Sequence, residues 1–303
     1  MNIGILGAGA MGSLYGGLLS QNNDVYLIDI WKEHVDTINI NGLKIVNKDD
    51  EIKFYPKATI DANLLPKLDL VIVFVKSIHT LKVIQDNKDI ICDETIVLSL
   101  QNGYGNAEEI ATVVKNENII VGTTSHGATL LGPGKIKHAG SGITYVGSLD
   151  KNSLHKAEKI KQAMRECNIE TDISDNILEL IWSKLIVNVA INPITALLRI
   201  ENGKLLESSD TLNLMRNLVY EGVDVARALG LSFEKESTFE KVKDVAKNTY
   251  NNKSSMLQDV LNERETEIRK INGAVVKEGS RLGIATPINE TVVMLVKSIR
   301  YCK

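Results

Sequence analysis

A glycine pattern near the amino terminus constrains the fold more than any other feature of this chain. The sequence begins Met1-Asn-Ile-Gly-Ile-Leu, and Gly7, Gly9 and Gly12 then form a G-x-G-x-x-G motif directly after this apolar run. Asp29 ends the next apolar run, 17 positions after Gly12. This order of strand, glycine turn, helix and acidic residue is typical of a unit that binds a dinucleotide.

Each glycine of the motif has its own task in such a unit. Gly7 allows the tight turn out of the strand, Gly9 lets the backbone approach a pyrophosphate, and Gly12 lets the helix pack closely on the sheet. The N–H groups and the partial positive charge at the helix start attract phosphates. A glycine turn without a ligand is the alternative reading. The predicted cofactor-binding residues of this unit are Gly7, Ala8, Gly9, Ala10, Met11, Gly12 and Asp29.

Bulk properties limit the classes of protein to consider. A chain of 303 residues suggests about two domains. The net charge of -3 argues against nucleic acid or an anionic membrane as the main partner. We expect neither a membrane span nor a signal peptide. Cys92, Cys167 and Cys302 are widely spaced and lack zinc spacing, which favours reduced thiols in a cytoplasmic protein.

The first half of the chain alternates short apolar runs with helical stretches, which predicts an α/β fold with a Rossmann-type, doubly wound parallel sheet. The predicted strands are Ile3–Leu6, Val25–Ile28, Leu70–Val75, Thr95–Leu100 and Ile119–Val121, with helices over Ser77–Asn87 and Gly105–Lys115. We further expect a hairpin of Lys135–Ala139 with Ile143–Gly147 around Gly140-Ser-Gly142, and a small pair of strands at Lys44–Val46 and Lys53–Tyr55.

The pattern changes after about residue 174, because strand signals give way to helical ones. The predicted helices are Asp175–Leu198, Leu212–Gly230, Phe233–Tyr250, Asn262–Leu282 and Asn289–Tyr301. Gly230 and Gly283 have the sequence context of helix C-caps. We therefore predict a dinucleotide-binding Rossmann domain over residues 1–174 and an all-helical domain for substrate binding and catalysis over residues 175–303.

The first helix of the second half carries polar residues where apolar ones are expected. Lys184, Asn188 and Asn192 recur every four residues in an otherwise apolar sequence, so they form one polar stripe. Burying an amide without a partner costs about 1–3 kcal/mol, and an unpaired ammonium costs more. The stripe therefore faces either a satisfied network between helices or a polar ligand. Pro193 predicts a break or kink just past Asn192.

Two further polar residues follow apolar strands of the first half. Lys76 comes after the strand that begins at Leu70, and Asn102 comes after the one that begins at Thr95. Ligands of open α/β sheets bind at the carboxyl ends of strands, so both residues are candidates for the cofactor crevice. The alternatives are a solvated loop lysine and, for Asn102 before Gly103, a simple turn.

The combination of these motifs resembles the ketopantoate reductase family, also called 2-dehydropantoate 2-reductases, over nearly the whole chain. The lysine–asparagine–proline segment and the Ser-Ser-Met-Leu-Gln-Asp segment carry more of the resemblance than the glycine motif. The matching pieces are the glycine motif, Val75-Lys76, Gln101-Asn102-Gly103-Tyr-Gly105, Gly122-Thr-Thr-Ser-His126, Trp182-Ser-Lys184-Leu-x-x-Asn188-x-x-x-Asn192-Pro, Asn202-Gly203, Ser254-Ser-Met-Leu-Gln-Asp259 and Glu267-Ile-x-x-Ile-Asn-Gly273.

The resemblance implies reduction of 2-dehydropantoate (ketopantoate) to (R)-pantoate, on the route to pantothenate and coenzyme A. It implies a nicotinamide held between a Rossmann domain and a helical domain. Lys184 matches the family's general acid, and Glu267 matches the carboxylate for the substrate hydroxyl. Positions that match substrate-binding residues are Asn102, Lys184, Asn188, Asn192, Asn202, Ser255 and Glu267. Positions near the cofactor are Lys76, Asn102 and Ala128.

The chemistry suits these residue types. Hydride transfer to a 2-oxo acid leaves negative charge on the carbonyl oxygen, and a nearby ammonium stabilises that charge and donates the proton. Burial lowers the pKa of a lysine toward working pH. Glu267 either orients Lys184 or binds the substrate hydroxyl. No metal is required, and no cluster of metal ligands is visible in the sequence.

The segment after the second strand departs from the family pattern. Many members carry an arginine there, suited to a 2′-phosphate, whereas this chain has Ile30. Asp29 accepts hydrogen bonds from a ribose 2′-OH and repels a 2′-phosphate. We therefore predict NAD(H), with NADP(H) as the alternative because Lys32 lies nearby.

Two rival functions stay open. One is a related NAD-dependent reductase of another small 2-oxo acid, and the other is a non-catalytic NAD-binding sensor. The polar stripe argues against the sensor, which has no use for a lysine aimed at a nicotinamide. The apolar surface of the helical half is sufficient for a homodimer, but no sequence feature establishes one.

Overall fold

The structure, a computed structural model, describes residues 1–47, 50–150 and 153–299. The chain divides into two compact units. Unit 1 contains Met1–Gln101 and Asn106–Leu178, and unit 2 contains Asn102–Gly105 and Glu179–Lys303. Unit 2 therefore takes a short piece of chain from within the first half of the sequence.

The core of unit 1 is an eight-stranded sheet, which confirms the predicted fold class. Its strands are β1 (Asn2–Leu6), β2 (Asp24–Ile28), β5 (Lys57–Thr59), β6 (Leu70–Val73), β7 (Ile96–Ser99), β8 (Ile119–Thr124), β11 (Thr144–Ser148) and β12 (Thr171–Ile173). The strand order is β12-β11-β8-β7-β6-β1-β2-β5. All pairs are parallel except β11 with β8. The chain reverses its winding direction between β1 and β6, which is where such sheets bind ligands.

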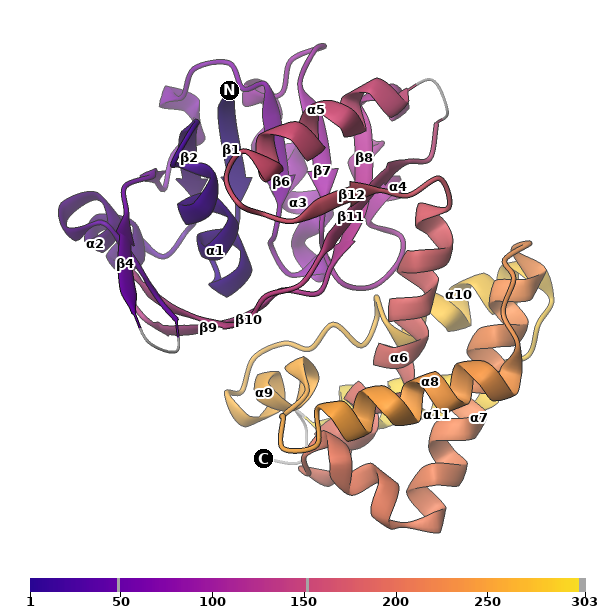
Figure 1. Ribbon diagram of the computed structural model, residues 1–303. Helices are drawn as coiled ribbons and strands as arrows, with labels where there is room; N and C mark the ends of the chain where they lie inside the picture. The colour runs from indigo at the N-terminus through magenta and orange to yellow at the C-terminus, as the bar shows by residue number, and fades with distance from the viewer. Residues whose placement is uncertain (48–49, 151–152, 300–303) are drawn as a thin grey trace. The chain divides into compact units, whose positions relative to one another are not determined.

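Helices cover both faces of this sheet (Figure 1). They are α1 (Ala10–Leu19), α2 (Lys32–Asn41), α3 (Thr80–Asp86), α4 (Asn106–Ile110) and α5 (Leu154–Arg165), with short 3-10 helices at η1 (Ala62–Leu64), η2 (Ser77–His79), η3 (Lys88–Ile90) and η4 (Asn116–Asn118). Helices α1 and α5 lie on the same face, and α3 lies on the other (Figure 1). The helices predicted over Ser77–Asn87 and Gly105–Lys115 are thus shorter than expected, and the second ends at Ile110.

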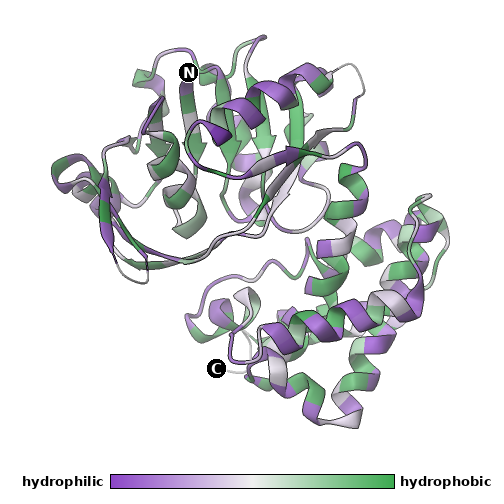
Figure 2. Ribbon diagram, in the orientation of Figure 1, coloured by the Kyte–Doolittle hydropathy of each residue, from purple (hydrophilic) through white to green (hydrophobic). Residues whose placement is uncertain are grey.

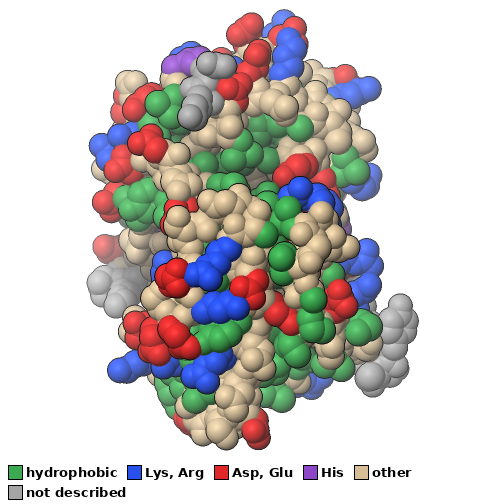
Figure 3. All heavy atoms as spheres, turned by 90° about the vertical axis from the view of Figure 1, so that its right-hand side faces the viewer, with side chains coloured by type: hydrophobic (Ala, Val, Ile, Leu, Met, Phe, Trp, Pro, Cys, Tyr) green, Lys and Arg blue, Asp and Glu red, His purple; other side chains and the backbone are tan. Residues whose placement is uncertain are grey.

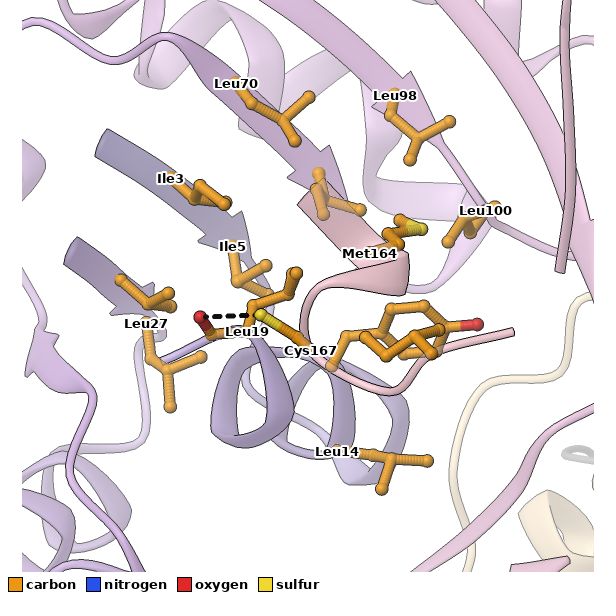
Figure 4. Close-up of a cluster of buried hydrophobic side chains, with 14 of the residues drawn as sticks. Ile3, Ile5, Leu14, Leu19, Leu27, Leu70, Leu98, Leu100, Met164 and Cys167 are labelled. Carbon is orange, nitrogen blue, oxygen red and sulfur yellow. Dashed lines mark hydrogen bonds between the residues drawn. The ribbon is translucent and has the colours of Figure 1, made fainter. Parts of the chain in front are cut away.

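The main apolar core lies between the sheet and the α1–α5 layer (Figure 4). Fully buried side chains of β1, α1 and β7, among them Ile5, Leu19 and Leu98, meet Met164 of α5 there. The Cys167 thiol is part of this core and donates to the Leu19 carbonyl at 3.6 Å. Burial raises the pKa of this thiol, so Cys167 is a packing residue rather than a nucleophile. Cys302 lies outside the described residues.

A second, four-stranded sheet packs on the other side of α1. Its strands, in spatial order, are β4 (Glu51–Phe54), β3 (Leu43–Val46), β10 (Lys135–Gly140) and β9 (Gly127–Gly132). The predicted pairing of Lys44–Val46 with the strand at Lys53 is confirmed, since Lys44 lies opposite Lys53. Helix α1 fits between the sheets because a Cβ on Gly16 would lie 2.3 Å from Leu27, and one on Gly17 would lie 2.8 Å from Ile45.

The predicted hairpin around Gly140-Ser-Gly142 is wrong. Strand β10 pairs with β9 and β3 in the small sheet, whereas β11 pairs with β8 and β12 in the main sheet. The hairpin turn lies instead at Gly132-Pro133-Gly134, where Gly134 has a φ of +65°. Two glycine pairs flank β10, and the sequence pattern did not reveal which pair closes a hairpin.

Unit 2 is helical, as predicted. Its elements are α6 (Ile177–Leu198), the 3-10 helix η6 (Asn202–Glu207), α7 (Ser209–Ala228), α8 (Lys235–Asn248), α9 (Ser255–Leu261), α10 (Asn272–Leu282) and α11 (Pro287–Ser298). Gly283 caps α10 with a φ of +73°, and Gly230, with a φ of +84°, follows the C-cap of α7. Tyr301, the predicted end of the last helix, lies outside the described residues.

The predicted helix over Asn262–Leu282 is wrong in its first half, because α10 begins only at Asn272. Glu263 adopts a left-handed φ of +54° after α9, residues 264–267 have no regular secondary structure, and residues 268–271 form a turn. Ile268 and Ile271 are nevertheless buried, at 2% and 1% exposure. The spacing of these two isoleucines is the same as that of buried residues on one face of a helix, but here both residues are buried in a turn.

The predicted break at Pro193 is also absent, since α6 runs without interruption from Ile177 to Leu198. Most side chains of this helix are apolar (Figure 2). Within the described residues, α6 is the one helix long and apolar enough to cross a membrane, but 61% of the apolar window is buried inside the protein. Such burial is typical of the central helix of a folded unit.

Charged side chains of both signs are interspersed on the face that Figure 3 shows. Exposed ion pairs elsewhere in the described residues include Lys82 with Asp86 and Lys204 with Glu207.

Candidate functional site

The glycine turn after β1 has a close-packed part and an open part. Gly7 has a φ of +94°, and its N–H donates to the Ile28 carbonyl at 2.9 Å. A Cβ on Gly12 would lie 1.9 Å from the Gly7 carbonyl oxygen, so α1 can approach β1 only with glycine there. A Cβ on Gly9 would meet nothing within 4 Å. Backbone conformation and close packing within the protein therefore require glycine at positions 7 and 12, whereas Gly9 borders open space.

The start of α1 is prepared for a negatively charged group. Gly9 is the N-cap, Ala10 and Met11 follow, and this fully described turn has neither a side-chain cap nor an acidic residue. The N–H groups of the first turn and the helix dipole therefore face the open space beside Gly9. These features fit the pyrophosphate of a dinucleotide.

Asp29 closes this turn from the end of β2. Its Oδ2 accepts the Ala8 N–H at 2.7 Å, and its Oδ1 accepts the Trp31 N–H at 2.9 Å. Ile30 is 96% exposed. Lys32, the residue that supported the NADP(H) alternative, forms an exposed ion pair with Asp36 at 2.7 Å.

The remaining predicted cofactor residues belong to different units. Lys76 lies in unit 1 between the end of β6 at Val73 and the 3-10 helix η2, and it is half-buried. Ala128 lies in β9, opposite His138. Asn102 belongs to unit 2. The chain just after Asn102 contacts the turn that follows Glu267, because the Tyr104 N–H donates to the Lys270 carbonyl at 3.0 Å.

The polar stripe of α6 consists of Lys184, Asn188 and Asn192. Lys184 is half-buried, and burial lowers the pKa of its ammonium from the usual 10.5 to about 8, while attraction to Glu267 opposes this shift. The charge interaction brings together the two residues that the sequence assigned to catalysis. A lysine with this pKa is protonated at neutral pH and gives up its proton readily.

Two further predicted substrate residues, Asn192 and Ser255, lie close together, and Asn192 is about two helical turns after Lys184 on α6. Asn192 is 5% exposed, and its Nδ2 donates to Ser255 Oγ at 3.4 Å. The neighbouring Ser254 caps α9 through the Leu257 N–H at 3.1 Å and bonds Thr195 of α6 at 2.7 Å. The serine pair thus fixes the start of α9 against the stripe.

Asn202 is placed separately, at the start of η6. Its Nδ2 donates to Thr249 Oγ1 at 2.9 Å. Its Oδ1 is buried and has no hydrogen-bond partner among the described residues. An unpaired buried carbonyl oxygen costs about 1–3 kcal/mol, so it is a natural position for a ligand donor.

The comparisons with known proteins agree along the whole chain. The family described as "Ketopantoate reductase PanE/ApbA" matches residues 3–151, and its C-terminal part matches residues 176–300. The chain belongs to the ketopantoate reductase family. The 2-dehydropantoate 2-reductase of Pyrococcus horikoshii is 38% identical over 98% of this chain and 97% of its own. That of Halobacterium salinarum is 35% identical over 98% of both chains.

Solved structures show the same fold. A D-mandelate dehydrogenase with NADH and anilino(oxo)acetate has a TM-score of 0.94 and 32% identity, covering 100% of this chain and 99% of its own. A 2-dehydropantoate 2-reductase from Enterococcus faecalis, described as putative, has a TM-score of 0.80 and 30% identity over the same shares. The NADH-bound relative supports a nicotinamide cofactor for this ketopantoate reductase family member.

Sequence reasoning overlooked several buried polar groups. Trp182 Nε1 has no partner among the described residues, and the ring of Tyr104 lies 5.3 Å from that of Trp182. His126 and His138 share a hydrogen bond of 3.1 Å, and burial lowers the pKa of both imidazoles. Trp182 and His126 are part of the family motifs in the sequence, but the sequence analysis assigned no function to either residue. Within the described residues, no group of three or more side chains could hold a metal ion.

Proposed function

We propose that this chain is a 2-dehydropantoate 2-reductase, which reduces the C2 ketone of ketopantoate to (R)-pantoate for pantothenate and coenzyme A synthesis. The observation that carries the proposal is the Lys184 ammonium, whose pKa of about 8 is set by burial and by Glu267. It lies on the same helix as Asn188 and Asn192, which supply amide groups for a carboxylate and a hydroxyl.

The proposed reaction assigns the proton to Lys184. A bound reduced nicotinamide supplies the hydride for C2 of the substrate. The protonated Lys184 donates a hydrogen bond to the ketone oxygen, stabilises the negative charge that develops there, and transfers its proton to that oxygen. Glu267 holds the ammonium in place or accepts a hydrogen bond from the substrate hydroxyl.

The proposal divides the work between the predicted domains. Residues 1–174 bind the cofactor, and residues 175–303, together with Asn102, bind the substrate. The substrate ligands of this proposal are Asn102, Lys184, Asn188, Asn192, Asn202, Ser255 and Glu267. The cofactor ligands are the glycine turn with Asp29, together with Lys76, Asn102 and Ala128. Cytoplasmic location and a homodimer stay predictions.

NAD(H) is the proposed cofactor, and NADP(H) is the alternative. Asp29 places a carboxylate next to the glycine turn, where it repels a 2′-phosphate. Its two hydrogen bonds to backbone N–H groups leave lone pairs for a ribose hydroxyl. Ile30 offers no positive charge, and Lys32 is engaged by Asp36.

A second candidate is reduction of another small 2-oxo acid. The similarity to D-mandelate dehydrogenase favours it, because the two structures match with a TM-score of 0.94 over 99% of the length of that dehydrogenase. Glu267 favours ketopantoate, because ketopantoate carries a hydroxyl that can donate a hydrogen bond to this carboxylate, whereas the 2-oxo acid that corresponds to mandelate carries none.

The test measures NADH oxidation with ketopantoate beside phenylglyoxylate, the 2-oxo acid that corresponds to mandelate. We expect a higher kcat/KM for ketopantoate. Replacing Glu267→Gln should reduce kcat/KM much more for ketopantoate than for phenylglyoxylate, and the neighbouring, exposed Glu265→Gln serves as the control. A preference for phenylglyoxylate in the wild type would establish the second candidate. Tight NADH binding without turnover of either acid would favour a sensor.

A further inference from the structure

Proline in the middle of α6 leaves one backbone carbonyl without its helical donor. Pro193 has no N–H, so the Val189 carbonyl, four residues earlier, loses the hydrogen bond that a helix normally provides. The amide of Asn272 replaces that bond, because its Nδ2 donates to Val189 O at 3.0 Å. Asn272 is fully buried, as the first residue of α10. This contact explains why α6 continues through the proline.

The orientation of the Asn272 amide is fixed by its partners. Its second N–H donates to Asn289 Oδ1 at 2.9 Å. Both partners are acceptors, so turning the amide around would place oxygen against oxygen. The Asn272 Oδ1 is buried and has no partner among the described residues. The position of the Asn272 amide is therefore set by its two acceptors, Val189 O and Asn289 Oδ1, and not by a partner of its own oxygen.

The far end of this contact is anchored to two other helices. Asn289 Nδ2 donates to Glu221 Oε2 at 2.7 Å, and the same carboxylate accepts the backbone N–H groups of Ile288 and Asn289 at 2.9 Å each. Glu221 belongs to α7 and caps the start of α11. The Val189 carbonyl is therefore tied through side chains to α10, α11 and α7.

The contact joins the two parts of the candidate substrate site. In the sequence of α6, Val189 lies between Asn188 and Asn192, two residues of the polar stripe. Asn272 comes five residues after Glu267, through a tight turn in which the Lys270 and Ile271 N–H groups donate to the Glu267 carbonyl at 2.9 and 3.1 Å. One amide thus connects the helix that carries the stripe with the turn that carries Glu267.

We propose that Asn272 is a positioning residue, which supplies the hydrogen bond that Pro193 removes from α6 and so sets the polar stripe and the Glu267 turn for the substrate. The role is indirect, because Asn272 acts through the Val189 carbonyl. The proposal rests on the proposed function for the identity of the substrate, and on the hydrogen bonds alone for the structural coupling.

A double-mutant cycle tests this role. In Asn272→Ala the Val189 carbonyl loses its donor, and we expect the KM for the 2-oxo acid to rise about tenfold while the KM for NADH stays within twofold. Pro193→Ala restores the backbone N–H, so this single variant should resemble the wild type. In the double variant the restored N–H replaces the amide, and the KM for the 2-oxo acid should return to within about threefold of the Pro193→Ala value.

Asn289→Ala is the matched control. It removes a fully buried asparagine of the same network but keeps Asn272 and Val189, the two partners of the bond under test. We expect a lower Tm with KM within twofold of the wild type. If Asn272→Ala does not fold, Asn272→Ser carries the test, since serine is too short to reach Val189. A KM that Pro193→Ala fails to restore, or an equal rise of KM in Asn289→Ala, would overturn the proposal.

Amide hydrogen exchange separates this inference from the proposed function. Exchange over residues 188–194 should accelerate in Asn272→Ala and return to the Pro193→Ala rate in the double variant. If the wild type reduces neither ketopantoate nor phenylglyoxylate, the proposed function fails, and the exchange rates alone decide the coupling. Rates that stay high in the double variant would then refute it.

Discussion

The glycine turn of unit 1 and the polar stripe of unit 2 are built in opposite ways. The turn works through backbone groups and through the space that missing side chains leave at Gly7, Gly9 and Gly12. The stripe works through long polar side chains on a helix that is otherwise apolar. Adding an atom should therefore damage the first site, whereas removing atoms should damage the second. Each prediction below tests one side of this difference.

The largest effect is expected at Lys184. Loss of one general acid lowers a rate by about 10²–10⁴, so Lys184→Ala should reduce kcat by this factor and leave the Kd of NADH unchanged. The exposed Lys241, which donates to Ser183 Oγ at 2.7 Å, offers a control in Lys241→Ala. In the wild type, kcat/KM should fall as pH rises through about 8, because the ammonium loses its proton there. Unchanged kcat in Lys184→Ala would remove the lysine from the mechanism.

The glycine turn should respond to added atoms in two distinct ways. Gly12→Ala forces a Cβ to 1.9 Å from a backbone oxygen, and we expect it to destabilise the free protein by about 1–3 kcal/mol or more. Gly9→Ala places its Cβ in open space, so the Tm of the free protein should not change while the Kd of NADH rises about tenfold or more, a factor worth about 1.4 kcal/mol.

The control for this pair is Gly140→Ala, whose Cβ would also meet nothing within 4 Å. It should alter neither Tm nor NADH binding. Wild-type affinity for NADH in Gly9→Ala would mean that the open space beside this residue does not receive the cofactor.

A smaller effect is expected at Ile30, which is 96% exposed. Ile30→Arg should raise kcat/KM for NADPH about tenfold, because a guanidinium pairs well with a phosphate and one such contact is worth about 1.5–3 kcal/mol at most. Lys32→Ala is the control and should leave the ratio of NADH to NADPH activity unchanged, since Lys32 pairs with Asp36. A wild type that prefers NADPH would contradict the assignment to NAD(H).

The smallest effect concerns stability. Burial makes the charged form of Lys184 unfavourable in the folded state, so at pH 7 Lys184→Met should raise the Tm by a few degrees, or about 1 kcal/mol. Between about pH 8 and 10.5 the unfolded wild type binds more protons than the folded one, so its stability rises with pH. The advantage of the variant should therefore be smaller at pH 9 than at pH 7. An advantage that grows with pH would have the wrong sign.

Sequence patterns predicted well those features whose cause is local. Continuous apolar runs such as Leu70–Val73 became buried strands, because a parallel sheet covers both faces of each strand. Patterns failed where two pairing solutions were compatible with the same residues, as for β10. They also failed at Ile268 and Ile271, because two buried residues of a turn can have the same sequence spacing as two buried residues of a helix.

The sequence by itself determined the dinucleotide turn, since Gly7 to Asp29 is one continuous segment whose geometry follows from steric limits on the backbone. It also placed Lys184, Asn188 and Asn192 on one face of a helix. Only the tertiary structure decided that Glu267 lowers the energy of the charged Lys184, that Ser255 meets Asn192, and that Asn272 completes the helix at Pro193. These contacts join residues 63–83 positions apart, and distant residues meet only when the helices between them have packed.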